Sequence, residues 1–298
     1  MTSILGSAGF ALLAAIVADP AVPDGGARPW VFAAEDTLEL PALFEMTEVE
    51  IRATRLEIGD IVSRCIDSEE KLRENISSLV YTQSVRTVLH VGGYGAGARK
   101  QLVIEQVDRV FFRKPDERRT VSLSVDRYVV ENGERRPWED GDEETVEVGW
   151  DDLSRLPFYL ADRDEYDFRI ASREIVGDRV IYEVQLAPRS DFEIAPSGTI
   201  WVDTSTFRIL REEFDFGDRV PMPMFVKSVG PFIRERERIG DTWVWKRFLV
   251  RATLRMGWLR FLEKDIPDVV ELMVSFRDHR VNEGWGAMGE TEPAVADR

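Results

Sequence analysis

The sequence is poor in the residues that metal sites and most catalytic sites use. Its 298 residues include a single cysteine, Cys65, so the chain cannot form an intrachain disulfide or supply a cysteine cluster for a metal ion. Its only two histidines, His90 and His279, lie in unrelated segments without ligand spacing. We therefore expect no cofactor, no metal and no catalytic residues, and we expect each histidine to be an ordinary strand residue.

Positive charge is also in short supply. The chain has 39 Lys and Arg against 55 Asp and Glu, a formal net charge of -16, which argues against a general attraction to nucleic acid or anionic lipid head groups. Arg247, Arg251, Arg255 and Arg260 could form a local basic patch, but we expect them to pair with the abundant carboxylates. The same abundance makes any one carboxylate pair weak support for a hydrolase, which stays a minor alternative.

The N-terminal segment contains the longest uncharged apolar run. Ile4 to Val17 is shorter than the roughly 20 residues that cross a bilayer as a helix, and it is typical of the apolar region of a secretory signal peptide. We predict a signal peptide at 1–18 and export to the periplasm. The alternatives are a buried or frayed N-terminal helix and a misassigned start. Because no cysteine lies near this segment, a lipid anchor on a processed N-terminal cysteine is excluded.

A linker and helical material follow. Residues 19–44 are rich in proline, glycine and small residues, which predicts a linker. The apolar spacing of 45–79 then predicts either one broken amphipathic helix or two helices that meet near Ser68, with Cys65 in the apolar stripe.

From residue 79 onward the apolar pattern has a period of two, which predicts strands. We expect strands at 79–89, 100–113, 119–126, 127–131, 166–176, 179–188, 199–203, 207–216, 232–239, 242–256 and 269–279. A short lid-like helix is expected at 151–160, an acidic solvated loop at 139–152, and a proline- and methionine-containing loop at 219–231. The glycine-rich segment Gly92–Gly97 leads into a strand instead of a helix, so it is typical of a hairpin tip and not of a phosphate-binding loop.

These elements predict a mainly β, α+β fold, because strands do not alternate with helices. A large antiparallel sheet twists, so we expect it to curve into an unclosed β-barrel with an N-terminal helix and a short helix near its mouth. The clearest hairpin is Ser197–Phe216, although its return strand mixes polar and apolar residues on both faces. We predict one half-barrel domain at 45–281 and a disordered tail at 282–298.

Aromatic residues are plentiful, with 8 Trp and 16 Phe. On a curved sheet such side chains either fill the interior or line a pocket for an apolar ligand. The candidate ligand-binding residues are Phe158, Tyr159, Trp201, Met222, Met224, Phe225, Trp243, Trp245, Phe248 and Trp258.

Several features together resemble the bacterial outer-membrane lipoprotein-sorting superfamily, which comprises the LolA-like lipoprotein carriers and related sigma-factor regulatory proteins. They are the export-like N-terminus, a helix before the first strand, the strand pair around Val107, Phe111, Lys114 and Pro115, and the run Gly198–Asp203 followed by Phe207, Arg208 and Ile209. The resemblance spans about residues 45–281 and implies an unclosed barrel that holds acyl chains in an apolar cavity.

Our leading hypothesis is therefore an exported, non-enzymatic protein that binds a lipid or a lipoprotein acyl chain and does not bind nucleic acid. The alternative is an envelope interaction or sensor module in which the sheet is packed and its edge or arginine face binds a partner protein.

Overall fold

The computed structural model describes residues 57–115, 117–138, 157–177, 179–190, 194–217, 220, 223–255 and 266–283. The predicted signal peptide, the linker, the acidic loop and nearly all of the predicted tail lie outside these residues.

Eleven strands form one antiparallel sheet, in the order β4-β3-β2-β1-β11-β10-β9-β8-β7-β6-β5. The strands are β1 (Ser78–Val91), β2 (Lys100–Arg113), β3 (Glu117–Glu131), β4 (Glu134–Pro137), β5 (Tyr166–Val176), β6 (Arg179–Pro188), β7 (Ser197–Asp203), β8 (Arg208–Asp215), β9 (Val226–Ile239), β10 (Thr242–Leu254) and β11 (Val269–Val281).

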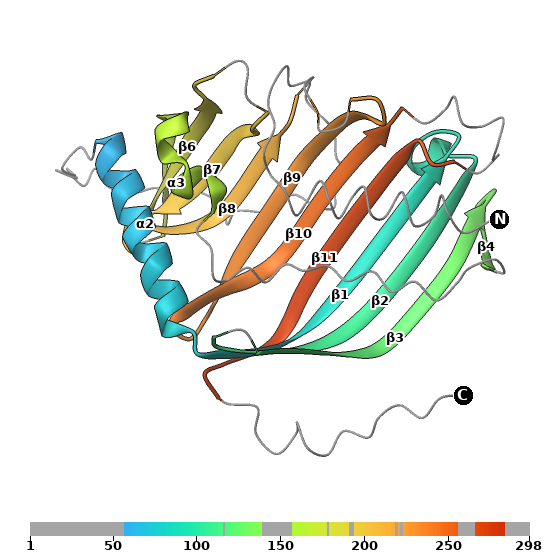
Figure 1. Cartoon of the computed structure of the whole chain (residues 1–298), viewed down its shortest axis with the longest axis horizontal. Helices are drawn as coiled ribbons and strands as arrows, with labels where there is room; N and C mark the ends of the chain where they lie inside the picture. The colour runs from blue at the N-terminus through green and yellow to red at the C-terminus, as the bar shows by residue number, and fades with distance from the viewer. Residues whose placement is uncertain are drawn as a thin grey trace.

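The sheet consists of two meanders that meet at its centre. Strands β1 to β4 follow one another on one side, β5 to β11 follow one another on the other, and β1 pairs with β11 between them. Figure 1 shows the resulting broad, curved sheet, with β3 and β4 at one end and β6 to β8 at the other. The edges β4 and β5 are not paired with each other, so the predicted unclosed, mainly β architecture is confirmed.

One long helix, α2 (Ile58–Asn75), lies across the β6 to β8 end of the sheet beside the short helix α3 (Phe158–Ala161) (Figure 1). The side chains that α2 buries recur at helical spacing and include Cys65, as predicted. Burial, with a smaller contribution from the Glu69 carboxylate, raises the pKa of the Cys65 thiol to about 12. The thiol is therefore protonated and inert at neutral pH.

The predicted alternative of two helices meeting near Ser68 is wrong, because α2 runs through that residue without a break. Ser68 is held by contacts to the β7–β8 turn that local sequence does not reveal. Its hydroxyl donates to the Thr206 carbonyl at 3.0 Å, and its own carbonyl accepts from Arg208.

Two strand boundaries also differ from expectation. The residues predicted as two strands at 119–126 and 127–131 form the single strand β3, and β9 begins at Val226, inside the segment predicted as a loop. Pro231 is tolerated in β9 because the pairing with β10 shifts register there, and proline is accepted at such irregularities.

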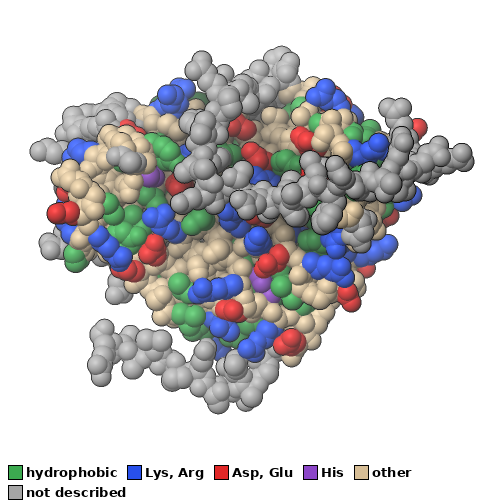
Figure 2. Space-filling model, turned by 180° about the vertical axis from the view of Figure 1, so that it is seen from behind, with side chains coloured by type: hydrophobic (Ala, Val, Ile, Leu, Met, Phe, Trp, Pro, Cys, Tyr) green, Lys and Arg blue, Asp and Glu red, His purple; other side chains and the backbone are tan. Residues whose placement is uncertain are grey.

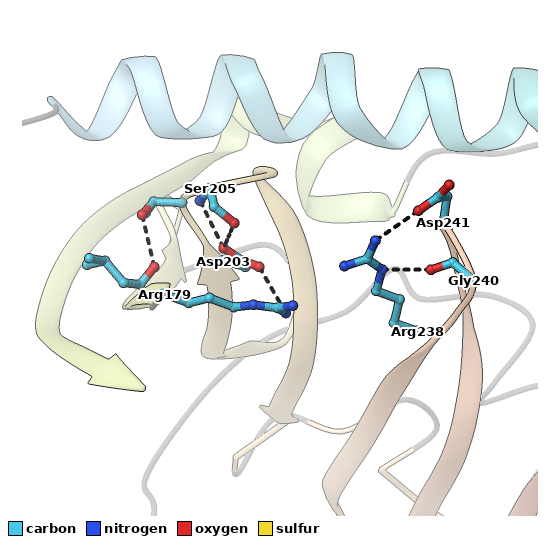
Figure 3. Close-up of polar contacts among 8 residues, drawn as sticks. Arg179, Asp203, Ser205, Arg238, Gly240 and Asp241 are labelled. Atoms are coloured by element: carbon cyan, nitrogen blue, oxygen red, sulfur yellow. Dashed lines mark hydrogen bonds and ion pairs between the residues drawn. The ribbon is translucent and has the colours of Figure 1, made fainter. Parts of the chain in front are cut away.

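The turns beneath α2 are fixed by short-range polar contacts (Figure 3). Asp203, at the end of β7, accepts from the Ser205 backbone N–H at 2.8 Å and hydroxyl at 2.6 Å, and Arg179 lies 3.5 Å from its other oxygen. In the β9–β10 turn, Arg238 donates to the Gly240 carbonyl and to Asp241. These contacts fix the shape of the β7–β8 and β9–β10 turns.

Figure 2 shows that acidic and basic side chains lie interspersed over the described surface of the opposite side of the molecule. Two members of the suspected basic patch behave as predicted: Arg247 pairs with Glu235 at 3.0 Å, and Arg251 pairs with Glu271 at 2.9 Å. Within the described ranges, no helix is long and apolar enough to span a membrane.

Candidate functional site

The register of the sheet defines the face on which α2 and α3 lie, here called the inner face. Arg236 of β9 contacts α2, so Phe232, Arg234 and Arg236 point to this face. Residues paired across strands share a face, and Phe232 pairs with Val250 and Phe214. Val250 in turn pairs with Leu272, which extends the face into β11.

The centre of the inner face is an apolar strip that crosses β10, β11 and β1. It consists of Val85, Phe248, Val250, Leu272 and Val274, each at most 4% exposed. These side chains belong to one core cluster, in which α2 is represented among the described residues only by Leu72 and by Ile76, the residue after its end. Among the described residues, the helices therefore reach only the margin of this strip.

The helix-covered end holds a second core cluster. It joins α2, α3 and β5 to β8 through Ile61, Cys65, Tyr159, Leu160 and other residues that are almost fully buried. Aromatic contacts continue from it towards the apolar strip, since Phe158 packs on Phe214, Phe214 on Phe232 and Phe232 on Phe248, with ring centroids 5.4, 5.9 and 5.1 Å apart. The two clusters are thus continuous across β8, β9 and β10.

A buried ionic network, made of Glu69, Tyr159, Glu212, Arg234 and Arg236, fastens the helices to the sheet. Arg236 lies 2.6 Å from Glu69 of α2, and Arg234 pairs with Glu212 of β8. The Tyr159 hydroxyl of α3 donates to Glu212 at 2.7 Å. Because ions buried without partners are strongly unfavourable, this reciprocal pairing is what allows charged groups to lie between the two clusters.

The electrostatics of the ionic network follow from its burial. Burial lowers the pKa of Arg236, but the Glu69 and Glu212 carboxylates outweigh this effect and raise it above its usual value. Burial, followed by the charge of Glu212, raises the pKa of Tyr159 well above its usual value. Arg236 also lies over the Trp245 ring, 4.3 Å from its centroid. The arginine is therefore charged and the phenol neutral at any physiological pH, which suits attachment and not proton transfer.

The structure separates the predicted ligand-binding residues into groups. Trp243, Trp245 and Phe248 belong to the cluster of the apolar strip, and Phe158 and Tyr159 belong to the helix-covered cluster. Trp201 pairs with Arg211, whose guanidinium lies over its ring and bonds to Glu235, so it points to the opposite face.

Four predicted ligand-binding residues remain. Met224 and Phe225 precede β9 and are 75% and 37% exposed, away from either cluster. Met222 and Trp258 lie outside the residues that the structure describes.

Four polar residues of the inner face were missed: Gln83 and Thr87 of β1, and Gln106 and Asp108 of β2. All are at most 4% exposed. The signal that could have found them is the alternation of β1, in which Gln83 and Thr87 share a face with Leu79, Tyr81, Val85 and Leu89. A polar residue in an otherwise apolar row is informative because it must find a partner.

The glycine-rich segment is a hairpin tip, as predicted. The backbone N–H groups of Gly92 and Gly93 both donate to one oxygen of Asp268, at 2.8 and 3.2 Å. His90 accepts from the Gly95 N–H through Nδ1 at 3.3 Å. An internal carboxylate therefore occupies the position that a bound anion would take in a phosphate-binding loop.

Metal ligation is not indicated within the described part of the chain, where no group of three or more His, Cys, Asp or Glu side chains could hold an ion. Burial lowers the pKa of both His90 and His279, although Glu271 and Glu237 respectively act in the opposite direction.

In comparisons with known proteins, no family model and no curated sequence matches this chain. Its structure is similar to that of a DUF1329 family protein from Desulfovibrio piger, with 11% identity and a TM-score of 0.34 over 76% of this chain and 94% of the other. It is similar to a LolA superfamily protein from Nitrosomonas europaea, with 12% identity and a TM-score of 0.32 over 74% and 94%.

The MucA/MucB complex of Pseudomonas aeruginosa also matches, at 11% identity and a TM-score of 0.23 over 74% of this chain and 99% of the other. The likeness to the LolA superfamily protein is one of structure alone. At identities and TM-scores this low, it carries no ligand and no partner over to this chain.

Proposed function

We propose that this protein is a non-enzymatic binding protein that holds the acyl chain of a lipid or lipoprotein against the apolar strip. The observation that carries the proposal is the extent of this strip, which spans three central strands and lies beyond the helix-covered cluster. Burying an acyl chain there is favourable by about 0.8 kcal/mol for each CH₂ group before the costs of binding are subtracted. The apolar segment Ile4–Val17 supports a place in the cell envelope.

The test uses the delipidated full chain and a fluorescent fatty-acyl probe. We expect saturable binding with a Kd of about 10 μM or tighter, which corresponds to more than about 7 kcal/mol. Absence of saturable binding at that concentration would overturn the proposal.

A pair of matched variants locates the binding face. Leu272→Gln introduces a polar group into the apolar strip and should weaken probe binding about tenfold or more, since a buried amide without partners is costly. Met273→Gln is the control, because Met273 is the next residue of β11, points to the opposite face and is 36% exposed. Equal probe binding by the two variants, with folding verified by circular dichroism, would contradict the assignment of the strip.

A second candidate function is binding of a partner protein at the edge of the sheet. Strand β4 pairs only with Tyr128–Glu131 of β3, so in the described structure the backbone of β3 before Tyr128 has a strand neighbour on one side only. Leu123 and Val125 of this edge are 46% and 40% exposed, and such an edge accepts an added strand.

This second function predicts a stoichiometric complex without acyl binding. Complex formation should slow hydrogen exchange of the β3 amides before Tyr128. The double variant Leu123→Arg, Val125→Arg should no longer form the complex. Unchanged exchange along β3 in a purified complex would exclude this edge as the interface.

A further inference from the structure

The polar group of β1 and β2, defined as Gln83, Thr87, Gln106 and Asp108, lies at one end of the apolar strip. Gln83 pairs directly with Asp108, and Val85, which lies between Gln83 and Thr87 on the same face, pairs with Gln106. The Gln106 side-chain amide donates to Asp108 Oδ2 at 2.8 Å. Thr87 pairs with Leu272 of the apolar strip, so the two surfaces are continuous.

Two oxygens of this polar group have no hydrogen-bond partner although they are buried. They are Gln83 Oε1 and Thr87 Oγ1, on residues that are 2% and 1% exposed. Leaving a buried acceptor unpaired is unfavourable, and buried polar groups in proteins are nearly always paired. These two oxygens therefore offer hydrogen bonds that the described chain does not use.

The chemistry of the polar group is dominated by acceptors. The Gln83 amide oxygen can only accept, whereas the Thr87 hydroxyl can accept or donate, so a ligand group that bonds to the Gln83 oxygen must donate, as an O–H or amide N–H does. The Asp108 carboxylate would repel a free fatty-acid carboxylate brought close to it. Ligand sites are commonly apolar with a few polar groups that fix orientation, which matches an apolar strip with acceptors at one end.

We propose that the polar group of β1 and β2 recognises a hydroxyl- or amide-bearing head group, so that the preferred ligand is an acyl compound with hydrogen-bond donors next to its chain. This inference rests on the proposed acyl-binding function and specifies its ligand class. The acyl chain would lie along the apolar strip, towards β10, and the donor group between Gln83 and Thr87.

The test compares two lipids that share an oleoyl chain. 1-Monooleoylglycerol carries two hydroxyl donors, and methyl oleate carries none. Both are titrated against the wild-type full chain loaded with the fluorescent acyl probe. We expect monooleoylglycerol to displace the probe with an affinity about tenfold higher than that of methyl oleate, which is the gain in affinity that one or two new hydrogen bonds provide.

Matched variants then locate the donor site. Thr87→Val and Gln83→Met each keep the side-chain volume while removing one unpaired acceptor, and each should lower the affinity ratio of the two lipids towards one. Thr82→Val is the control: Thr82 lies on the same strand, is 2% exposed and has an unpaired Oγ1, but points to the opposite face. Its ratio should stay at the wild-type value.

The outcomes separate this inference from the proposed function. Equal displacement by both lipids in the wild-type protein overturns the inference and leaves acyl binding intact, whereas displacement by neither overturns both. A preference that survives in both Thr87→Val and Gln83→Met, or that is lost in Thr82→Val, also overturns it. The wild-type comparison needs no variant, so a folding defect in one variant does not remove the test.

Discussion

The two ends of the inner face bury polar side chains in opposite ways. At the helix-covered end, Glu69 and Glu212 are each paired with an arginine of β9, and the Tyr159 hydroxyl is bonded to Glu212 as well. At the β1–β2 end, Gln83 and Thr87 keep unpaired oxygens. The first end is thus an attachment site whose ionic groups are paired, whereas the second is the end at which we propose that a ligand binds.

The largest effect is expected from breaking the helix-covered end. Arg236→Met leaves the Glu69 carboxylate buried and uncompensated, so the free energy of unfolding should fall by about 3–5 kcal/mol. Urea denaturation measures it. Arg211→Met is the control, because Arg211 pairs with Glu235 and Glu213 on the opposite face and is 28% exposed, and it should cost about 1 kcal/mol or less. Similar losses in both variants would show that the ionic network does not hold the helices.

A smaller effect of opposite sign is expected at the β1–β2 end. Thr87→Val removes a hydroxyl that is buried without a partner, so the ligand-free protein should gain about 1 kcal/mol of unfolding free energy. The same substitution at Thr204 should instead cost about 1 kcal/mol, since Thr204 donates to the Val180 carbonyl at 2.9 Å. Destabilisation by Thr87→Val, measured by urea denaturation, would mean that its hydroxyl is bonded in solution.

The smallest effect concerns the pH dependence of stability, and it involves neither of the two compared groups of polar residues. The pKa values of His90 and His279 lie below their usual 6.5 in the folded chain, so the unfolded chain binds more protons near that pH. Stability should therefore rise with pH from the folded pKa values up to about 6.5 and then level off.

Thermal unfolding between pH 5 and 7.5 measures this slope in the wild type and in the variant with His90→Gln and His279→Gln. The variant should lose most of the slope, since ordinary carboxylates titrate near pH 4 and these are the only histidines. An identical slope in the two proteins would exclude buried histidines as its cause.

Strand positions and their antiparallel connection were predictable from the sequence, because alternation and turn residues act locally. The hairpin β7–β8 is an example. The burial of β8 was not predictable from its mixed pattern of polar and apolar residues. The reason is that the β7–β8 pairing shifts register between Trp201 and Val202, opposite Leu210. Because of this β-bulge, Ile209 and Glu212 are both buried on the same face, although an odd- and an even-numbered residue of a regular strand would point to opposite faces.

The candidate site was less predictable, for a physical reason. Glu69 lies in the apolar stripe of α2, where the local sequence offers no reason for a charged residue. Its partner Arg236 lies far along the chain and comes beside it only in the folded structure. Likewise, Gln83 and Thr87 can be identified as candidate binding residues only once the fold places them beside Leu272 and the rest of the apolar strip. Aromatic residues drew attention by type, but register and not composition decided that Trp201 faces away from Phe248.

The β1–β11 pairing has a consequence for how this protein folds. Leu79 and Val281 are partners although nearly the whole described chain separates them, so the loop between them must close before this pairing can form. Each meander can form its own hairpins early, whereas the surface that spans β10, β11 and β1 comes into existence only when the last strand docks. Folding of this chain should thus be slow for its size, and its binding surface should be among the last parts to appear.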